Sequence, residues 1–140
     1  MRQQGFGHII NIGSLSGLIP VPFFGPYSAR EAALTGFTLG LAAEAELHGV
    51  RVSLVCPETL DTGMARSASV LPLVSLADAA QRIIKGICRN ERIIVFPLYA
   101  RAMWWMERIN PGLLRLWNRE IVRRHAQREA ERPVSIPTAA

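Results

Sequence analysis

The apolar residues of this chain gather in three short runs separated by two helical patterns. The runs are HIINIGS at 8–14, VRVSLVC at 50–56 and RIIVFP at 92–97. Each run is rich in β-branched residues and too short for a helix, which is typical of buried strands. Near-continuous apolar strands that alternate with helices predict an α/β fold in which a parallel sheet is covered on both faces.

The first helix is predicted between the first two strands. Residues 27–48 are rich in Ala, Leu and Glu, and apolar side chains recur at helical spacing at Ala33, Phe37, Leu41 and Ala45. This spacing places the four side chains on one face of the predicted helix.

The second half of the chain contains one more predicted helix and a separate helical region. Ser75 and Asp78 form a capping-box pattern in front of an apolar face, so a helix is expected to begin there. After the third strand, residues 99–132 are basic and rich in Trp, with a helix break at 110–112 (Asn-Pro-Gly). Residues 133–140 are expected to form a disordered tail. The predicted organisation is therefore 1–98, 99–132 and 133–140.

Charge is concentrated at the C-terminal end. The formal net charge is +5, and residues 101–140 carry +4 of it. A nucleic-acid-binding surface over the whole chain is therefore not expected. No apolar run reaches the ~18 residues that a membrane span requires, and the first residues lack the apolar core of a signal peptide, so a cytoplasmic protein is expected.

The C-terminal region leaves three interpretations open. Residues 99–124 alternate Trp and Leu with Arg, a pattern typical of helices that lie on an anionic membrane surface. The same apolar stripes are suited to a lid over an apolar substrate, or to covering the sheet or a partner subunit. Peripheral membrane contact is the least favoured of the three.

Cysteine and histidine point to no metal site. The two cysteines, Cys56 and Cys88, lack metal or redox spacing and are interpreted as buried thiols. The three histidines are scattered along the chain without carboxylate or cysteine partners nearby, so no metal ligand set is expected.

Hydroxyl groups follow the first strand at positions that suggest chemistry. Ser14 ends the strand, and Tyr27 begins the next helix thirteen residues later. The segment PETLDT at 57–62 follows the second strand. Because ligands bind outside the carboxyl ends of strands in an open α/β sheet, these three features are expected to share one crevice. A phenol beside a hydroxyl can hold a carbonyl oxygen and pass it a proton.

Three segments that contain these residues resemble the short-chain dehydrogenase/reductase family. They are NIGSLSG at 11–17, YSAREAALTGF at 27–37 and VRVSLVCPETLDTGM at 50–64. The resemblance covers about the first hundred residues. It implies a Rossmann-like fold, of which 1–98 is the C-terminal half, and interconversion of an alcohol and a carbonyl with NAD or NADP. It also implies an apolar substrate and a homo-oligomer formed through helix 27–48.

The resemblance assigns roles to individual residues. Tyr27 is the expected general acid/base, and Ser14 is expected to hold the substrate oxygen. Pro57, Glu58 and Thr62 occupy the positions of the family's cofactor contacts.

Glu31 stands where the family has a lysine. A close cation lowers the pKa of a tyrosine, and a carboxylate raises it. Arg30 precedes Glu31, but a guanidinium is bulkier than an ammonium, and we expect Arg30 not to take over the role of the lysine. Glu58 likewise replaces a glycine and adds negative charge beside the expected cofactor.

The Gly-rich phosphate-binding turn of the family has no counterpart in this sequence, and the N-terminal strands are expected to be missing before Met1. These departures predict weakened cofactor binding. The alternative to an oxidoreductase is a truncated, catalytically inactive remnant, a pseudoenzyme that serves as a binding or oligomerisation module.

Overall fold

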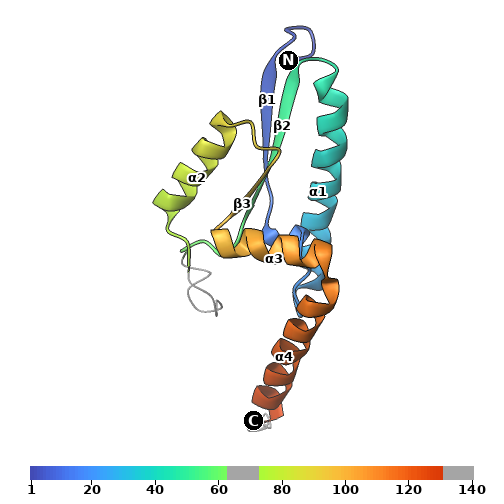
Figure 1. Ribbon diagram of the computed structural model, residues 1–140, viewed down its shortest axis with the longest axis vertical. Coiled ribbons are helices and arrows are strands. Elements are labelled where there is room, and N and C mark those ends of the chain that lie inside the picture. The colour runs from blue at the N-terminus through green and yellow to red at the C-terminus, as the bar shows by residue number, and fades with distance from the viewer. Residues whose placement is uncertain (63–72, 131–140) are drawn as a thin grey trace, which may run out of the picture.

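The computed structural model describes residues 1–62 and 73–130, which are arranged around a three-stranded sheet (Figure 1). All strands are parallel, and their spatial order follows the chain. The strands are β1 (Gly7–Ile12), β2 (Val50–Pro57) and β3 (Ile93–Phe96). Each lies within one or two residues of a predicted apolar run, so the three strands were predicted correctly.

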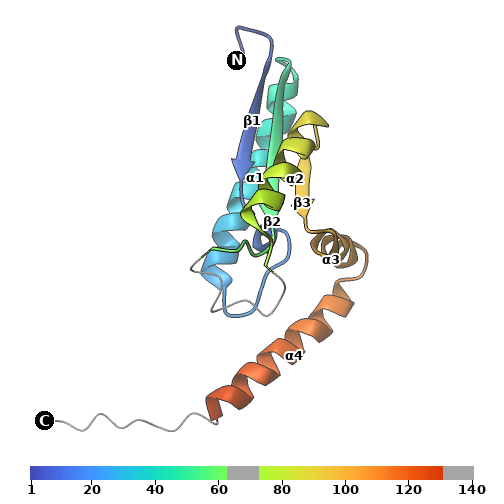
Figure 2. The same cartoon turned by 90° about the vertical axis from the view of Figure 1, so that its left-hand side faces the viewer.

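Helices cover both faces of the sheet, as Figures 1 and 2 show. Helix α1 (Gly25–Glu46) packs on one face, where Ala42 and Ala45 contact Val52. Helix α2 (Leu76–Cys88) packs on the other face, where Ala79 lies in a cluster with Val55 of β2. Val52 and Val55 point to opposite faces because side chains alternate along a strand. The predicted α/β fold with a three-layer, Rossmann-like arrangement is confirmed.

The buried face of α1 follows the apolar spacing only in part. Ala45 is buried and Leu41 packs on the same cluster, whereas Phe37 is 62% exposed and Ala33 is exposed as well. The other buried residues of the helix are Ser28, Glu31, Thr38 and Ala42.

Polar contacts explain why Thr38, a polar residue, is buried on this helix. Its hydroxyl donates to the carbonyl of Leu34 at 2.7 Å and accepts from the side-chain amide of Asn11 in β1 at 2.9 Å. A buried hydroxyl that both donates and accepts a hydrogen bond costs little free energy to remove from water. The apolar residues of α1 are too scattered around the helix to reveal this face by themselves.

Helix α2 begins as the capping pattern predicts. The hydroxyl of Ser75 accepts a hydrogen bond from the backbone N–H of Asp78 at 3.0 Å and donates to the carboxylate of Asp78 at 2.7 Å. Cys88, at the end of this helix, is exposed, whereas Cys56 in β2 is fully buried. The expectation of two buried thiols was therefore wrong for Cys88, which follows from its place in the last turn, away from the sheet.

The C-terminal helices meet the carboxyl end of the sheet. Helix α3 (Leu98–Ile109) crosses this end in Figure 1, and Met103 and Trp104 pack on the cluster that contains Leu54. Helix α4 (Pro111–Ala130) projects beyond the sheet (Figure 2), and its His125 stacks on Phe23 with ring centroids 4.2 Å apart. The helix break was predicted at the right place.

These helices combine covered and open apolar residues. Leu114 is buried in the same cluster, whereas Trp105 and Trp117 remain about half exposed. Within residues 1–62 and 73–130, no helix is both long and apolar enough to cross a bilayer. The expected disordered tail, 133–140, lies outside the described residues.

Candidate active site at the carboxyl end of the sheet

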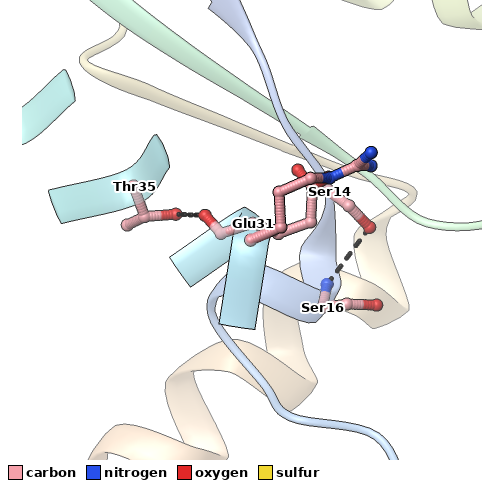
Figure 3. A network of polar contacts seen from close by, with 5 residues as sticks. Ser14, Ser16, Glu31 and Thr35 are labelled. Carbon is pink, nitrogen blue, oxygen red and sulfur yellow. Dashed lines mark hydrogen bonds and ion pairs between the residues drawn. The ribbon is translucent and has the colours of Figure 1, made fainter. Parts of the chain in front are cut away.

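Ser14 lies just beyond β1, where the chain turns into a short 3-10 helix, η1 (Leu15–Gly17). It is the N-cap of η1, with an extended backbone, and its hydroxyl oxygen accepts a hydrogen bond from the backbone N–H of Ser16 at 3.2 Å. Figure 3 shows this contact. A hydroxyl that accepts through a lone pair keeps its proton for donation, so Ser14 can still donate to a ligand oxygen.

Tyr27 lies in the first turn of α1, immediately after Pro26. Proline favours the first turn of a helix because its missing N–H would have no intrahelical partner there. The side chain of Tyr27 is among the exposed large residues, at 40%. Its phenol therefore stands at the start of α1 with access to solvent and to a ligand.

Close packing of η1 on α1 brings the elements of Ser14 and Tyr27 together. A Cβ atom added at Gly17 would lie 2.6 Å from the carbonyl oxygen of Glu31 and 2.9 Å from the hydroxyl of Thr35. Only glycine allows the two segments to approach this closely. The serine-bearing turn and the tyrosine-bearing helix therefore meet at the carboxyl end of the sheet.

The side chain of Glu31 is buried, with 5% of the residue exposed. Its carboxylate approaches Gly13, where a Cβ atom would be 3.4 Å from Oε2, and it lies near the end of β1 in Figure 3. The pKa of the Cys56 thiol is raised to about 12. Burial is the main cause, and the negative charge of Glu31 adds to it. The residue at the family's lysine position thus points into the protein beside Gly13, just beyond the carboxyl end of β1.

Arg30 pairs with this buried carboxylate. Its Nε and Nη2 atoms donate to the same oxygen of Glu31 at 3.0 and 2.6 Å. The guanidinium carbon also lies 5.0 Å from the ring centroid of Tyr27, within the range of a cation–π contact. From the sequence, Arg30 was expected not to take over the role of the lysine because a guanidinium is bulkier than an ammonium. In the structure, the guanidinium of Arg30 contacts both Tyr27 and Glu31.

The pKa of Arg30 is raised above its usual value. The hydrogen bond and the charge of Glu31 are the main causes, and Tyr27 adds a smaller contribution in the same direction. The guanidinium of an arginine in this setting stays charged.

The residues after β2 form a second polar group. Pro57 is the last residue of β2 and pairs with Phe96. The carboxylate of Glu58 accepts hydrogen bonds from the backbone N–H of Thr59 at 2.5 Å, from its hydroxyl at 3.0 Å, and from the hydroxyl of Tyr99 at 3.0 Å. Three donors spread the negative charge of Glu58 and tie the loop to α3.

Tyr99 is a member of this group that the sequence did not reveal. Its pKa is raised to about 12 by burial first and then by its hydrogen bond with Glu58 and the charge of that carboxylate. No local pattern links residues 58 and 99, since α3 reaches the loop only through the packing of β3. Thr62 is exposed at the end of the described loop, and its backbone N–H donates to the carbonyl of Leu60.

Comparison with known proteins identifies the family. The family model described as short chain dehydrogenase matches residues 1–70, half of the chain. The protein belongs to the short-chain dehydrogenase family. It therefore belongs to a family of oxidoreductases, as the segments around Ser14, Tyr27 and Pro57 indicated.

Two similar proteins show the range of the family. A protein named putative oxidoreductase SadH from Mycobacterium tuberculosis is 36% identical in an alignment of 124 positions that covers 76% of this chain and 45% of that protein. Human 17-beta-hydroxysteroid dehydrogenase 13 is 27% identical in an alignment of 116 positions that covers 79% of this chain and 39% of that protein. The chain thus spans less than half the length of these relatives.

Solved structures share the fold. A short chain dehydrogenase from Burkholderia cenocepacia in complex with NADP superimposes with a TM-score of 0.75 at 24% identity, over 83% of this chain and 48% of that one. A short-chain dehydrogenase from Sphingobium yanoikuyae in complex with NADPH gives a TM-score of 0.65 at 22% identity, over 99% and 51%. At these identities the likeness supports the fold and leaves the chemistry to the residues of the site.

Proposed function

We propose that the protein interconverts an alcohol and a carbonyl compound with NAD or NADP. The observation that carries the proposal is the close packing of Gly17, in the turn that Ser14 caps, against Glu31 and Thr35 of α1, the helix whose first turn bears Tyr27. A bound nicotinamide dinucleotide would donate or accept the hydride. Tyr27 would exchange the proton with the substrate oxygen, and Ser14 would donate a hydrogen bond to the same oxygen.

The residues present fit the nicotinamide half of such a cofactor. Ser14 keeps a free hydroxyl proton, Tyr27 is accessible, and Arg30 offers N–H groups beyond the two that Glu31 engages. The carboxylate of Glu58 is held by three donors, so its charge is partly compensated. Pro57 and Thr62, at the end of β2 and in the following loop, complete the positions expected to contact the cofactor.

We propose an apolar substrate at the same end of the sheet. Leu15 and Leu18 pack in one cluster with Tyr99, Met103 and Trp104 of α3. These contacts place α3 over the carboxyl end of the sheet, where a cover over an apolar substrate would lie. Hydrophobic side chains around a few convergent polar groups are the usual lining of a small-molecule site.

Fluorescence titration with NADH and NADPH tests the proposal on the 140-residue chain and on the Glu31→Lys/Glu58→Gly double variant. Binding to the chain, followed by oxidation of the reduced cofactor in the presence of apolar aldehydes or ketones, is expected. Binding to the double variant alone would instead favour the inactive remnant. If neither folded protein binds, the oxidoreductase proposal fails for this chain.

Self-association is a second proposal, and the exposed side of α1 is the surface that supports it. Phe37 is 62% exposed, and a Cβ atom added at Gly36 or Gly40 would meet no heavy atom within 4 Å. A large apolar residue between two open glycines suits close helix packing against a second copy. Sedimentation of the wild type and of Phe37→Glu tests this proposal. The wild type is expected to form an oligomer, and the variant is expected to be monomeric.

Peripheral membrane contact through 99–124 stays a prediction.

A further inference from the structure

Three side chains in the first two turns of α1 form a continuous chain of contacts. The guanidinium of Arg30 lies 5.0 Å from the ring centroid of Tyr27 and is hydrogen-bonded to Glu31 at 2.6 and 3.0 Å. Residues three positions apart on a helix share a face, so Arg30 can cover the ring of Tyr27. The neighbouring carboxylate then fixes the direction of the guanidinium.

Burial explains why this arrangement is stable. The side chain of Glu31 is 6% exposed, whereas that of Arg30 is 71% exposed. An isolated carboxylate at such a site would be strongly unfavourable, and a hydrogen-bonded cation compensates it. Within residues 1–62 and 73–130, Arg30 is the cation that forms an ion pair with Glu31. The exposed side of the guanidinium remains open toward solvent.

We propose that Arg30 supplies the positive charge that the family's lysine supplies in its relatives, with Glu31 serving to anchor it against Tyr27. The assignment rests on the proposed oxidoreductase function and deepens it. The positive charge of Arg30 lies one residue before the position of the family's lysine and contacts Tyr27 across the face of its ring. Glu31, at the lysine position, holds the guanidinium in place.

Two physical consequences follow for the site. A cation at the ring favours the deprotonated form of a phenol, which is the form that accepts a proton from an alcohol. The planar guanidinium also presents several N–H groups in a fixed geometry, which suits a pair of neighbouring hydroxyls such as those of a ribose. Arg30 would therefore contact the cofactor and act on Tyr27 at once.

Matched variants separate the charge of Arg30 from the burial of Glu31. Glu31→Gln keeps the cation and removes the buried charge. Arg30→Ala/Glu31→Gln removes both, so it leaves no unpaired buried carboxylate that would unfold the protein. Arg30→Ala/Glu31→Lys returns a cation at the family position. Arg119→Ala, on exposed α4, controls for the loss of an arginine.

The readouts are NADPH affinity by fluorescence, the pH profile of alcohol oxidation and the melting temperature. We expect Glu31→Gln to bind within about threefold of the wild type. Arg30→Ala/Glu31→Gln is expected to bind about tenfold or more weakly, as the loss of a charge-assisted hydrogen bond implies. Its oxidation profile should move toward higher pH, and Arg30→Ala/Glu31→Lys should reverse both changes.

The outcomes distinguish the two proposals. If the wild type binds NADPH and reacts, while Arg30→Ala/Glu31→Gln matches Glu31→Gln in affinity and pH profile, the assignment of Arg30 is wrong and the oxidoreductase stands. If the folded wild type binds no dinucleotide, the proposed function falls and the assignment falls with it. Arg119→Ala is expected to match the wild type in all three measurements.

Discussion

The hydroxyl oxygen of Ser14 accepts a hydrogen bond from the backbone N–H of Ser16 at 3.2 Å. This contact caps η1 and fixes the orientation of the side chain at the end of β1. The proton of the hydroxyl is not used by the cap. Ser14 therefore has a structural role through its lone pair and is free for a chemical role through its proton.

Substitutions at Ser14 and Tyr27 separate these roles. Tyr27→Phe is expected to lower turnover about 10²-fold or more, because general acid–base catalysis contributes that much, while the free energy of unfolding changes by less than ~0.5 kcal/mol. Ser14→Ala should lower turnover and also reduce stability by about 1 kcal/mol, since the cap is lost. Ser14→Thr, which keeps the hydroxyl, is the control. Undiminished turnover in Tyr27→Phe would rule out the acid/base role.

Gly17 is expected to be intolerant of any side chain. A Cβ atom there would lie 2.6 Å from a backbone oxygen of Glu31, which cannot rotate away. We expect Gly17→Ala to lower the free energy of unfolding by about 1–3 kcal/mol, as for other overpacked sites. Gly25→Ala is the matched control, because its Cβ would meet no heavy atom within 4 Å. At the first position of α1 it should change the free energy of unfolding by less than ~0.5 kcal/mol. Equal midpoints in denaturant for both variants would contradict the close packing.

The two cysteines should differ in reactivity and in pH dependence. Cys88 is exposed and is expected to react with a thiol reagent in the folded protein, whereas Cys56 should react only on unfolding. The pKa of Cys56 is about 12 when folded, against an ordinary value of 9.0. Its contribution to stability is therefore complete below pH 9 and is lost as the pH rises toward 12. Denaturant unfolding at several pH values measures this: as the pH rises, the free energy of unfolding should fall less in Cys56→Ala than in the wild type.

The contact between Glu58 and Tyr99 can be measured by titration. Burial and Glu58 raise the pKa of Tyr99 to about 12. In a Tyr27→Phe background Tyr99 is the sole tyrosine, so phenolate absorbance reports it alone. Glu58→Gly should bring the pKa part of the way back toward 10.0, with the remaining elevation due to burial. Glu44→Gln, on the exposed side of α1, should leave the titration unchanged; an unchanged titration in Glu58→Gly as well would exclude the contact.

Much of this protein could be predicted from the sequence because the signals are local. The strands follow from short β-branched runs, the start of α2 from the Ser75 cap, and the helix break from Asn110 and Pro111. The order of Ser14 and Tyr27 along the chain placed both residues at the carboxyl end of a parallel sheet. Such features depend on the conformation of a few neighbouring residues, which the sequence specifies directly.

Only the tertiary structure decided which side chains meet. In the sequence, Arg30 could be judged only by the bulk of its side chain. Its place against Tyr27 depends on the burial of Glu31 beside Gly13, at the end of β1. The outward position of Phe37 and the contact of Tyr99 with Glu58 depend likewise on how closely separate elements pack. These relationships arise from steric fit and from the pairing of buried polar groups across the fold, and no periodicity in the sequence records them.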